Sequence, residues 1–145
     1  MGIFLGAYPC GVVPLWDELF GSESISQVCA LGLNFFIYNK QTICLQVYGV
    51  VIEYLSQLPQ KDRERLTDLI YDDNCHLARF AQRKNLRAKN EVTKFFAEKV
   101  RKNVDRFHFG NHIDLWCIEN CDPNKVRELD NVNTEICEQL FRQCF

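Results

Sequence analysis

Three observations predict a helix-rich α/β domain of the α+β type. The apolar residues 66–71 end on the acidic turn Asp72-Asp73-Asn74, which is typical of a strand. Apolar side chains then recur at helical spacing at Leu77, Phe80 and Ala81, and again over residues 91–101, which predicts two helices. Residues 104–109 alternate imperfectly between apolar and polar side chains and predict a second strand.

Weaker patterns define the rest of the chain. Residues 1–21 hold six Gly and Pro residues, which predicts a turn-rich, partly extended start, and Ser22-Glu23-Ser24 offers an N-cap for a buried helix that ends near Phe36. Residues 43–58 favour a helix, although a strand fits residues 47–52 nearly as well. Asn133-Thr134 predicts the N-cap of a final helix whose buried side carries Cys137, Leu140, Phe141 and Cys144.

Length and composition limit the class of protein. The 145 residues are 47% hydrophobic and 25% charged with a net charge of −2, which excludes a disordered or fibrous chain and allows one domain or part of one, spanning residues 1–145. No basic residue precedes Lys40, and polar residues interrupt the apolar stretch of residues 28–55, so neither a secretory signal nor a membrane span is expected. Eight cysteines beside 11 phenylalanines indicate buried thiols in a reducing compartment. We expect a soluble intracellular protein that contacts no membrane.

Charge is concentrated in the middle of the chain. Residues 61–110 carry thirteen basic and eight acidic side chains, and residues 79–89 carry five cations and no carboxylate. Such a segment is either a solvated helix face or a surface for a phosphate backbone. DNA is therefore a candidate partner through residues 79–102, while the sequence does not define the oligomeric state.

Two histidines and two cysteines lie within fourteen residues. His108, His112, Cys117 and Cys121 combine the nitrogen and sulfur ligands that suit four-coordinate Zn²⁺, which predicts a structural zinc site. The alternative is that these side chains pack in a core. Cys75 and His76 offer a second source of ligands. A thiol hydrolase that pairs Cys75 with His108 or His112 has no local nucleophile motif to support it.

Carboxylates suggest a second kind of metal site. Asp72, at the end of a predicted strand, and either Glu135 or Glu138 on the final helix could converge on Mg²⁺. Such an arrangement activates water and stabilises the leaving oxygen in phosphodiester chemistry. The alternative interpretation of the two glutamates is a solvated helix edge.

Three separate elements together resemble one family. They are Tyr71-Asp72-Asp73-Asn74-Cys75, Val104-Asp105-Arg106-Phe107-His108 with the following His112 and Cys117, and Asn133-Thr134-Glu135-Ile136-Cys137-Glu138-Gln139. Their order and spacing resemble the Kyakuja-Dileera-Zisupton (KDZ) family of DDE-type DNA transposases. The resemblance covers about half of the chain, from Tyr71 to Gln139.

The resemblance implies an RNase H-like catalytic core that cleaves and transfers DNA strands with Mg²⁺ in the nucleus. It assigns Asp72 as the second catalytic Asp and Glu138 as the catalytic Glu, in preference to Glu135. It also places His108, His112, Cys117 and Cys121 in a metal-chelating insertion. Asp17 does not resemble the family's first catalytic Asp, so we expect a partial core that lacks its first catalytic strand and its C-terminal end and is inactive alone. The alternative is a non-catalytic zinc-stabilised module that binds DNA or protein.

Overall fold

The computed structural model describes residues 2–6, 15–19, 40–137 and 139. Within these residues the chain is a helix-rich small domain of mixed α/β content, which confirms the predicted class at this level. The elements are β1 (Gly2–Gly6), β2 (Leu15–Leu19), α1 (Lys40–Gln57), α2 (Gln60–Arg63), β3 (Asp68–Ile70), α3 (Asn74–Ala81), α4 (Lys84–Arg87), α5 (Glu91–Lys99), β4 (Arg101–Asn103), α6 (Arg106–Phe109), α7 (Leu115–Asn120), and the 3-10 turns Pro123–Lys125 and Arg127–Leu129.

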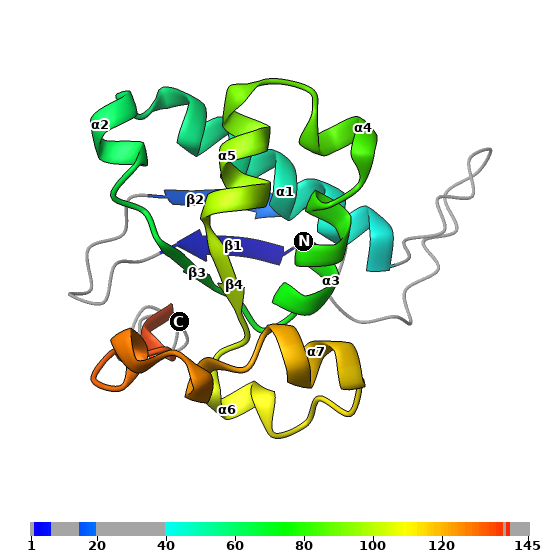
Figure 1. The fold of residues 1–145 in the computed structure, drawn as a ribbon, viewed down its shortest axis with the longest axis vertical. Coiled ribbons are helices and arrows are strands. Elements are labelled where there is room, and N and C mark those ends of the chain that lie inside the picture. The colour runs from blue at the N-terminus through cyan, green and yellow to red at the C-terminus, as the bar shows by residue number, and fades with distance from the viewer. Residues whose placement is uncertain (1, 7–14, 20–39, 138, 140–145) are drawn as a thin grey trace.

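The main core lies between α1, α3 and α5. Helix α1 buries Val47, Val51 and Leu55 along one side, a helical spacing that settles the choice between helix and strand for this segment. The ring of Tyr48 meets Phe80 of α3 and Phe96 of α5 edge to face, with centroids 5.5 and 5.9 Å apart. These contacts hold the three helices together above the strands in Figure 1.

A parallel pair of strands forms the base of the predicted site. Strand β3 pairs with β4 in the register Asp68↔Arg101 to Ile70↔Asn103, and α3, α4 and α5 make the crossover between them. Arg101 reinforces the pairing because its Nε donates to Asp68 Oδ1 at 2.8 Å. The crossover brings both strands to an end beside the start of α3 (Figure 1).

The second strand was predicted too late in the sequence. Residues 101–103 form β4, while residues 106–109 form α6, and the helix predicted over residues 91–101 ends at Lys99. Asp105 explains the difference, because its side-chain oxygen accepts the backbone N–H of His108 at 2.9 Å and caps a helix where alternation indicated a strand.

The ends of the chain compare with the predictions only in part. Residues 2–6 and 15–19 form an antiparallel pair, so Asp17 lies on strand β2, in a sheet separate from β3 and β4. The helix predicted before Phe36 lies outside the described residues. Cys137 of the predicted final helix is half-buried, and Leu140, Phe141 and Cys144 lie outside the described residues. No helix in the described ranges is long and apolar enough to cross a membrane.

Candidate metal centre

Helix α3 carries the first ligand of the candidate site. Its Leu77 and Phe80 face the main core, while Cys75 and Ala78 face a second, smaller cluster with Val104, Cys117 and Cys121. An eight-residue helix that is buried on both sides fixes the direction of its side chains. Cys75 therefore points away from the main core, toward the segment that follows β4.

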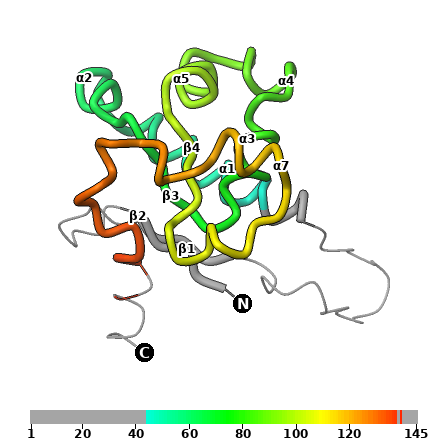
Figure 2. The backbone as a smooth tube through the Cα atoms, turned by 60° about the horizontal axis from the view of Figure 1, so that its bottom comes forward, coloured from blue at the N-terminus to red at the C-terminus, as the bar shows by residue number. Residues whose placement is uncertain are grey.

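The segment after β4 folds back against α3 to supply the other ligands (Figure 2). Asp114 caps α7 because its Oδ1 accepts a hydrogen bond from the backbone N–H of Trp116 at 2.8 Å. The same oxygen accepts a hydrogen bond from Nη2 of Arg79 on α3 at 2.8 Å. The backbone N–H of Val104 donates to the carbonyl of Cys121 at 2.9 Å, which ties the end of α7 to the end of β4. Helix α7 is thereby held with Cys117 toward α3.

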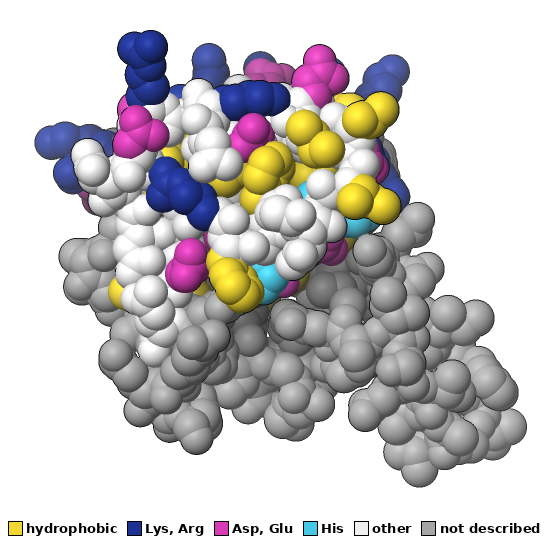
Figure 3. Space-filling view, turned by 90° about the horizontal axis from the view of Figure 1, so that it is seen from below, with side chains coloured by type: hydrophobic (Ala, Val, Ile, Leu, Met, Phe, Trp, Pro, Cys, Tyr) yellow, Lys and Arg dark blue, Asp and Glu magenta, His cyan; other side chains and the backbone are white. Residues whose placement is uncertain are grey.

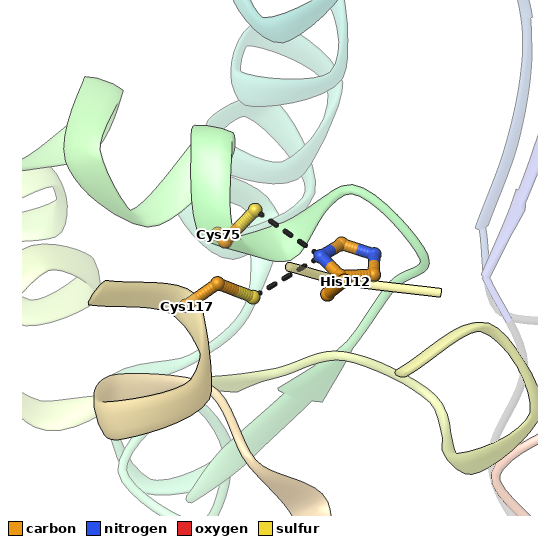
Figure 4. Close-up of side chains that lie close together, drawn as sticks. All are labelled: Cys75, His112 and Cys117. Carbon is orange, nitrogen blue, oxygen red and sulfur yellow. Dashed lines mark hydrogen bonds between the residues drawn. The ribbon is translucent and has the colours of Figure 1, made fainter. Parts of the chain in front are cut away.

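Cys75, His112 and Cys117 converge in one compact group, as Figure 4 shows. The Nδ1 atom of His112 lies 3.6 Å from Sγ of Cys75 and 3.1 Å from Sγ of Cys117. All three ligand atoms lie within 4.8 Å of one another, and both cysteines are buried. Ligands bound to tetrahedral Zn²⁺ at about 2.1 Å (N) and 2.3 Å (S) lie roughly 3.6 Å apart, so the spacing fits this ion. The cluster could hold a metal such as zinc.

Cys121 lies next to this group and offers a fourth ligand. Its side chain is buried in the same small cluster as Cys75 and Cys117, and the three thiols influence one another's pKa. Burial raises the pKa of Cys75 to about 12, that of Cys121 to about 11, and that of Cys117 as well. The three are thiols at neutral pH unless a metal ion displaces their protons, which argues against Cys75 as a nucleophile.

A buried cation stands near the thiols. Lys102 is 8% exposed, and its Nζ donates to the carbonyl of Val100 at 2.5 Å and to that of Ala97 at 3.3 Å. Burial lowers the pKa of Lys102 to about 8, and Cys121 is the group that opposes this shift. Zinc with three thiolates and a neutral imidazole carries one net negative charge, which the ammonium of Lys102 would offset.

Two predicted zinc ligands lie outside the group of three: Cys121, which borders it, and His108. The Nδ1 of His108 lies 2.7 Å from Oδ2 of Asp105, and the charge of His108 and that of Asp105 both act on Asp72. The pKa of Asp72 is raised because the side chain is buried. The backbone N–H of Asp73, which donates to Asp72 Oδ1 at 2.7 Å, opposes this shift. The structure thus divides the predicted residues into a Cys/His group and an Asp72, Asp105 and His108 group.

The closing acidic element approaches the second group. The backbone N–H of Arg106 donates to Thr134 Oγ1 at 3.2 Å, directly after Asp105. Glu135 is half-buried, and its backbone N–H donates to Asn133 Oδ1 at 3.1 Å. Glu138 lies outside the described residues, so its distance from Asp72 is not part of this geometry.

Cys75 replaces His108 in the ligand group that the geometry favours. The Cys75-His76 pair gave the sequence signal for this ligand, but a dipeptide 37 residues away from His112 has no spacing that could assign it. Only the crossover from β3 to β4 brings the two regions together.

Comparisons with known proteins yielded no match. A scan of protein-family models, a search of curated proteins and a search of solved structures each found none for this chain.

Proposed function

We propose that this chain supplies part of a KDZ-like transposase core, an RNase H-like unit for metal-dependent DNA strand cleavage and transfer that a zinc centre stabilises. One observation supports the proposal above the others: residues of two sequence elements that resemble the family meet in space at two places. Nδ1 of His112 lies 3.6 Å from Sγ of Cys75. The charges of His108 and Asp105 act on the pKa of Asp72.

The parallel pairing of β3 and β4 explains why Asp72 and Asp105 would lie close together. Asp72 and Asp105 each follow the last residue of their strand by two positions, and those last residues, Ile70 and Asn103, are register partners in a parallel pair. Carboxyl ends of parallel strands share one edge of a sheet, where functional side chains gather in open α/β folds. The two carboxylates would hold Mg²⁺, and Glu138 would add a ligand from the closing element.

Zinc would have a positioning role in this core. The Cys/His group joins α3, which follows Asp72, to the segment that follows Asp105. A closed set of one nitrogen and three sulfur ligands has no position for substrate, as is typical of a structural site. The zinc centre would therefore fix the distance between the two acids without taking part in the chemistry.

Mn²⁺ binding tests the acidic site directly. In the zinc-loaded protein, Mn²⁺ is expected to broaden the backbone amide resonances of Asp73 and Arg106, which follow the two acids. The effect should be lost in Asp72→Asn, with zinc content unchanged. Equal broadening in Asp72→Asn, or none in the wild type, would contradict the proposal.

Activity of the chain alone is expected to be absent. No residue of the sequence matches the family's first catalytic Asp, which two divalent ions would share, so supercoiled plasmid should not be nicked with Mg²⁺ or Mn²⁺. Asp72→Ala is the control for a contaminating nuclease. Nicking by the wild type but not by Asp72→Ala would show that the chain holds a complete site, with Asp105 in the place of the first catalytic Asp.

A binding module remains the second candidate because of one exposed surface. The segment that carries the zinc ligands presents four large apolar side chains to solvent, which gather beside the histidines in Figure 3. They are Phe107, Ile113, Leu115 and Ile118. Duplex binding that depends on zinc but is unchanged in Asp72→Asn, without Mn²⁺ broadening, would favour this candidate.

A further inference from the structure

A second group of metal ligands lies at the start of α3. Asp73, Cys75 and His76 each offer one ligand atom, and these atoms lie within 4.8 Å of one another. Cys75 belongs to this group and also to the group of His112 and Cys117. The sequence offered Cys75 and His76 as a second source of ligands, and the structure adds Asp73 to them.

One pair in this group has the spacing of ligands around a bound ion. Sγ of Cys75 lies 3.5 Å from Nδ1 of His76, close to the 3.6 Å that separates it from Nδ1 of His112. Nδ1 of His76 also contacts Oδ1 of Asp73, which lies three positions earlier and is the N-cap residue of α3. Residues three apart share one side of a helical turn, so the backbone itself holds this pair together.

Exposure distinguishes the two groups. The side chains of His76 and Asp73 are 35% and 27% exposed, whereas Cys75 is 1% exposed and Cys117 is fully buried. The group of Asp73 and His76 therefore opens toward solvent on one side of the shared sulfur. Three protein ligands with access to water form the pattern of an open metal site, in contrast to a closed structural one.

We propose that Asp73, Cys75 and His76 form a second site for a transition-metal ion of the Zn²⁺ or Co²⁺ class, with the Cys75 thiolate shared between two ions and water in the open position. The inference rests on the zinc centre of the proposed function, because the inner ion ionises the shared thiol. Nitrogen, oxygen and sulfur in one site suit these ions better than Mg²⁺.

Titration with Co²⁺ tests the second site. In excess Mg²⁺, which fills the acidic site proposed at Asp72 and Asp105, the wild-type chain is expected to bind about two Co²⁺ ions, and His76→Ala about one, with the inner ion retained. His108→Ala is the matched control, because His108 belongs to neither group, and should still bind about two. Cys75→Ala should lose the outer ion completely. His76→Gln, which keeps a polar side chain of similar size, checks that any loss does not come from damage to α3.

Cadmium NMR gives an independent measure of the shared sulfur. With ¹¹³Cd²⁺, two resonances are expected, and both should correlate with the β-protons of Cys75. A single ion in the wild type, or an outer ion that persists in both His76 variants, would overturn the second site and reduce the Asp73 and His76 contact to a helix cap. Absence of any bound ion would instead refute the zinc centre itself, so the two failures are distinguishable.

Discussion

Cys75 is the residue on which both candidate metal groups depend. Its side chain is buried, and burial raises the pKa of its thiol to about 12, so it carries a proton at neutral pH in the metal-free protein. A thiol of this kind is a poor nucleophile, but a metal ion that displaces the proton gains a strong ligand. Its neighbours, His76 on one side and His112 on the other, offer nitrogen ligands at nearly equal distances.

Substitution of Cys75 should therefore weaken zinc binding more than substitution of His108. Cys75→Ser is expected to lower the zinc affinity at least about 100-fold, because it removes one thiolate from the centre. His108→Ala is expected to change it less than about threefold, because His108 pairs with Asp105. Competition titration with a chromogenic chelator measures both. Equal losses in the two variants would restore His108 to the ligand set.

The protonated thiols also predict how zinc binding depends on pH. The pKa values of Cys75, Cys117 and Cys121 are all raised, so between pH 7 and 8 each thiol must release a proton when zinc binds. The apparent zinc affinity should therefore increase about 1000-fold per pH unit and weaken equally as pH falls. A slope near 100-fold would indicate two cysteine ligands, as the set with His108 requires.

At the scale of elements, Asn74 joins the ends of the two parallel strands. Its Nδ2 donates to the carbonyls of Leu69 and Asn103 at 2.7 and 2.9 Å, and the residue is fully buried at the start of α3. It thereby holds β3, β4 and α3 at the place where Asp72 and Cys75 emerge. Removal of this side chain takes one donor from each carbonyl, and the carbonyl of Asn103 keeps the backbone N–H of Tyr71 at 3.2 Å.

Asn74→Ala should lower the free energy of unfolding by about 1–3 kcal/mol, since it removes two hydrogen bonds that contribute about 0.5–1.5 kcal/mol each. Asn85→Ala, an exposed asparagine of α4, is the matched control and should change it by less than about 0.5 kcal/mol. Urea denaturation of the zinc-loaded proteins measures both values. A similar small change in the two variants would show that Asn74 does not stabilise the junction.

Helices were easier to predict from the sequence than strands, for a physical reason. The helix over residues 43–58, where a strand fitted residues 47–52 nearly as well, and the shorter helix with Leu77, Phe80 and Ala81 pack apolar side chains against one core. The structure confirms both helices. Strand β4 has only three residues, Arg101, Lys102 and Asn103, whose polar side chains give no alternating pattern. Lys102 is buried there because its ammonium reaches carbonyls at the end of α5, a tertiary contact that no local pattern contains.

The candidate site residues that are close in sequence were likewise easier to predict than those that distant segments bring together. His112, Cys117 and Cys121 are close in sequence, and their ligand types predicted a metal site that the structure supports in its coarse form. Cys75 joins them through the crossover, and Asp105 joins Asp72 through the strand register. Both partners come from contacts between distant segments, which spacing within one segment cannot specify.

At the scale of the whole molecule, exposed positive charges gather on and beside α4. Arg83, Lys84, Arg87 and Lys89 are exposed around α4, whereas Arg79 is paired with Asp114 and its guanidinium lies 4.5 Å from the ring centre of Trp116. Lys84 and Lys89 can contact phosphates, whereas Arg87 lies 3.9 Å from Glu98 and Arg83 lies over the ring of Phe80. Arg79 holds α7 against α3. The basic segment thus combines two roles that the sequence did not separate.

Binding to duplex DNA is expected to be weak, independent of base sequence and dependent on salt. Lys84→Ala should reduce the slope of log affinity against log salt by about 1, because each phosphate contact contributes about one released counterion. Glu91→Gln, which removes an exposed negative charge nearby, is the control and should not reduce it. Fluorescence anisotropy at several salt concentrations measures the slope. Affinity that does not change with salt would contradict a phosphate-binding surface.

X-ray absorption at the zinc edge determines the number and type of ligands in the proposed zinc centre. Protein loaded with one equivalent of Zn²⁺ should show about three sulfur ligands at about 2.3 Å and one nitrogen ligand at about 2.0–2.1 Å, from Cys75, Cys117, Cys121 and His112. Cys75→Ser should reduce the sulfur count by one, and His108→Ala should leave the spectrum unchanged. Two sulfur and two nitrogen ligands in the wild type, or a shell made mainly of oxygen, would contradict the account.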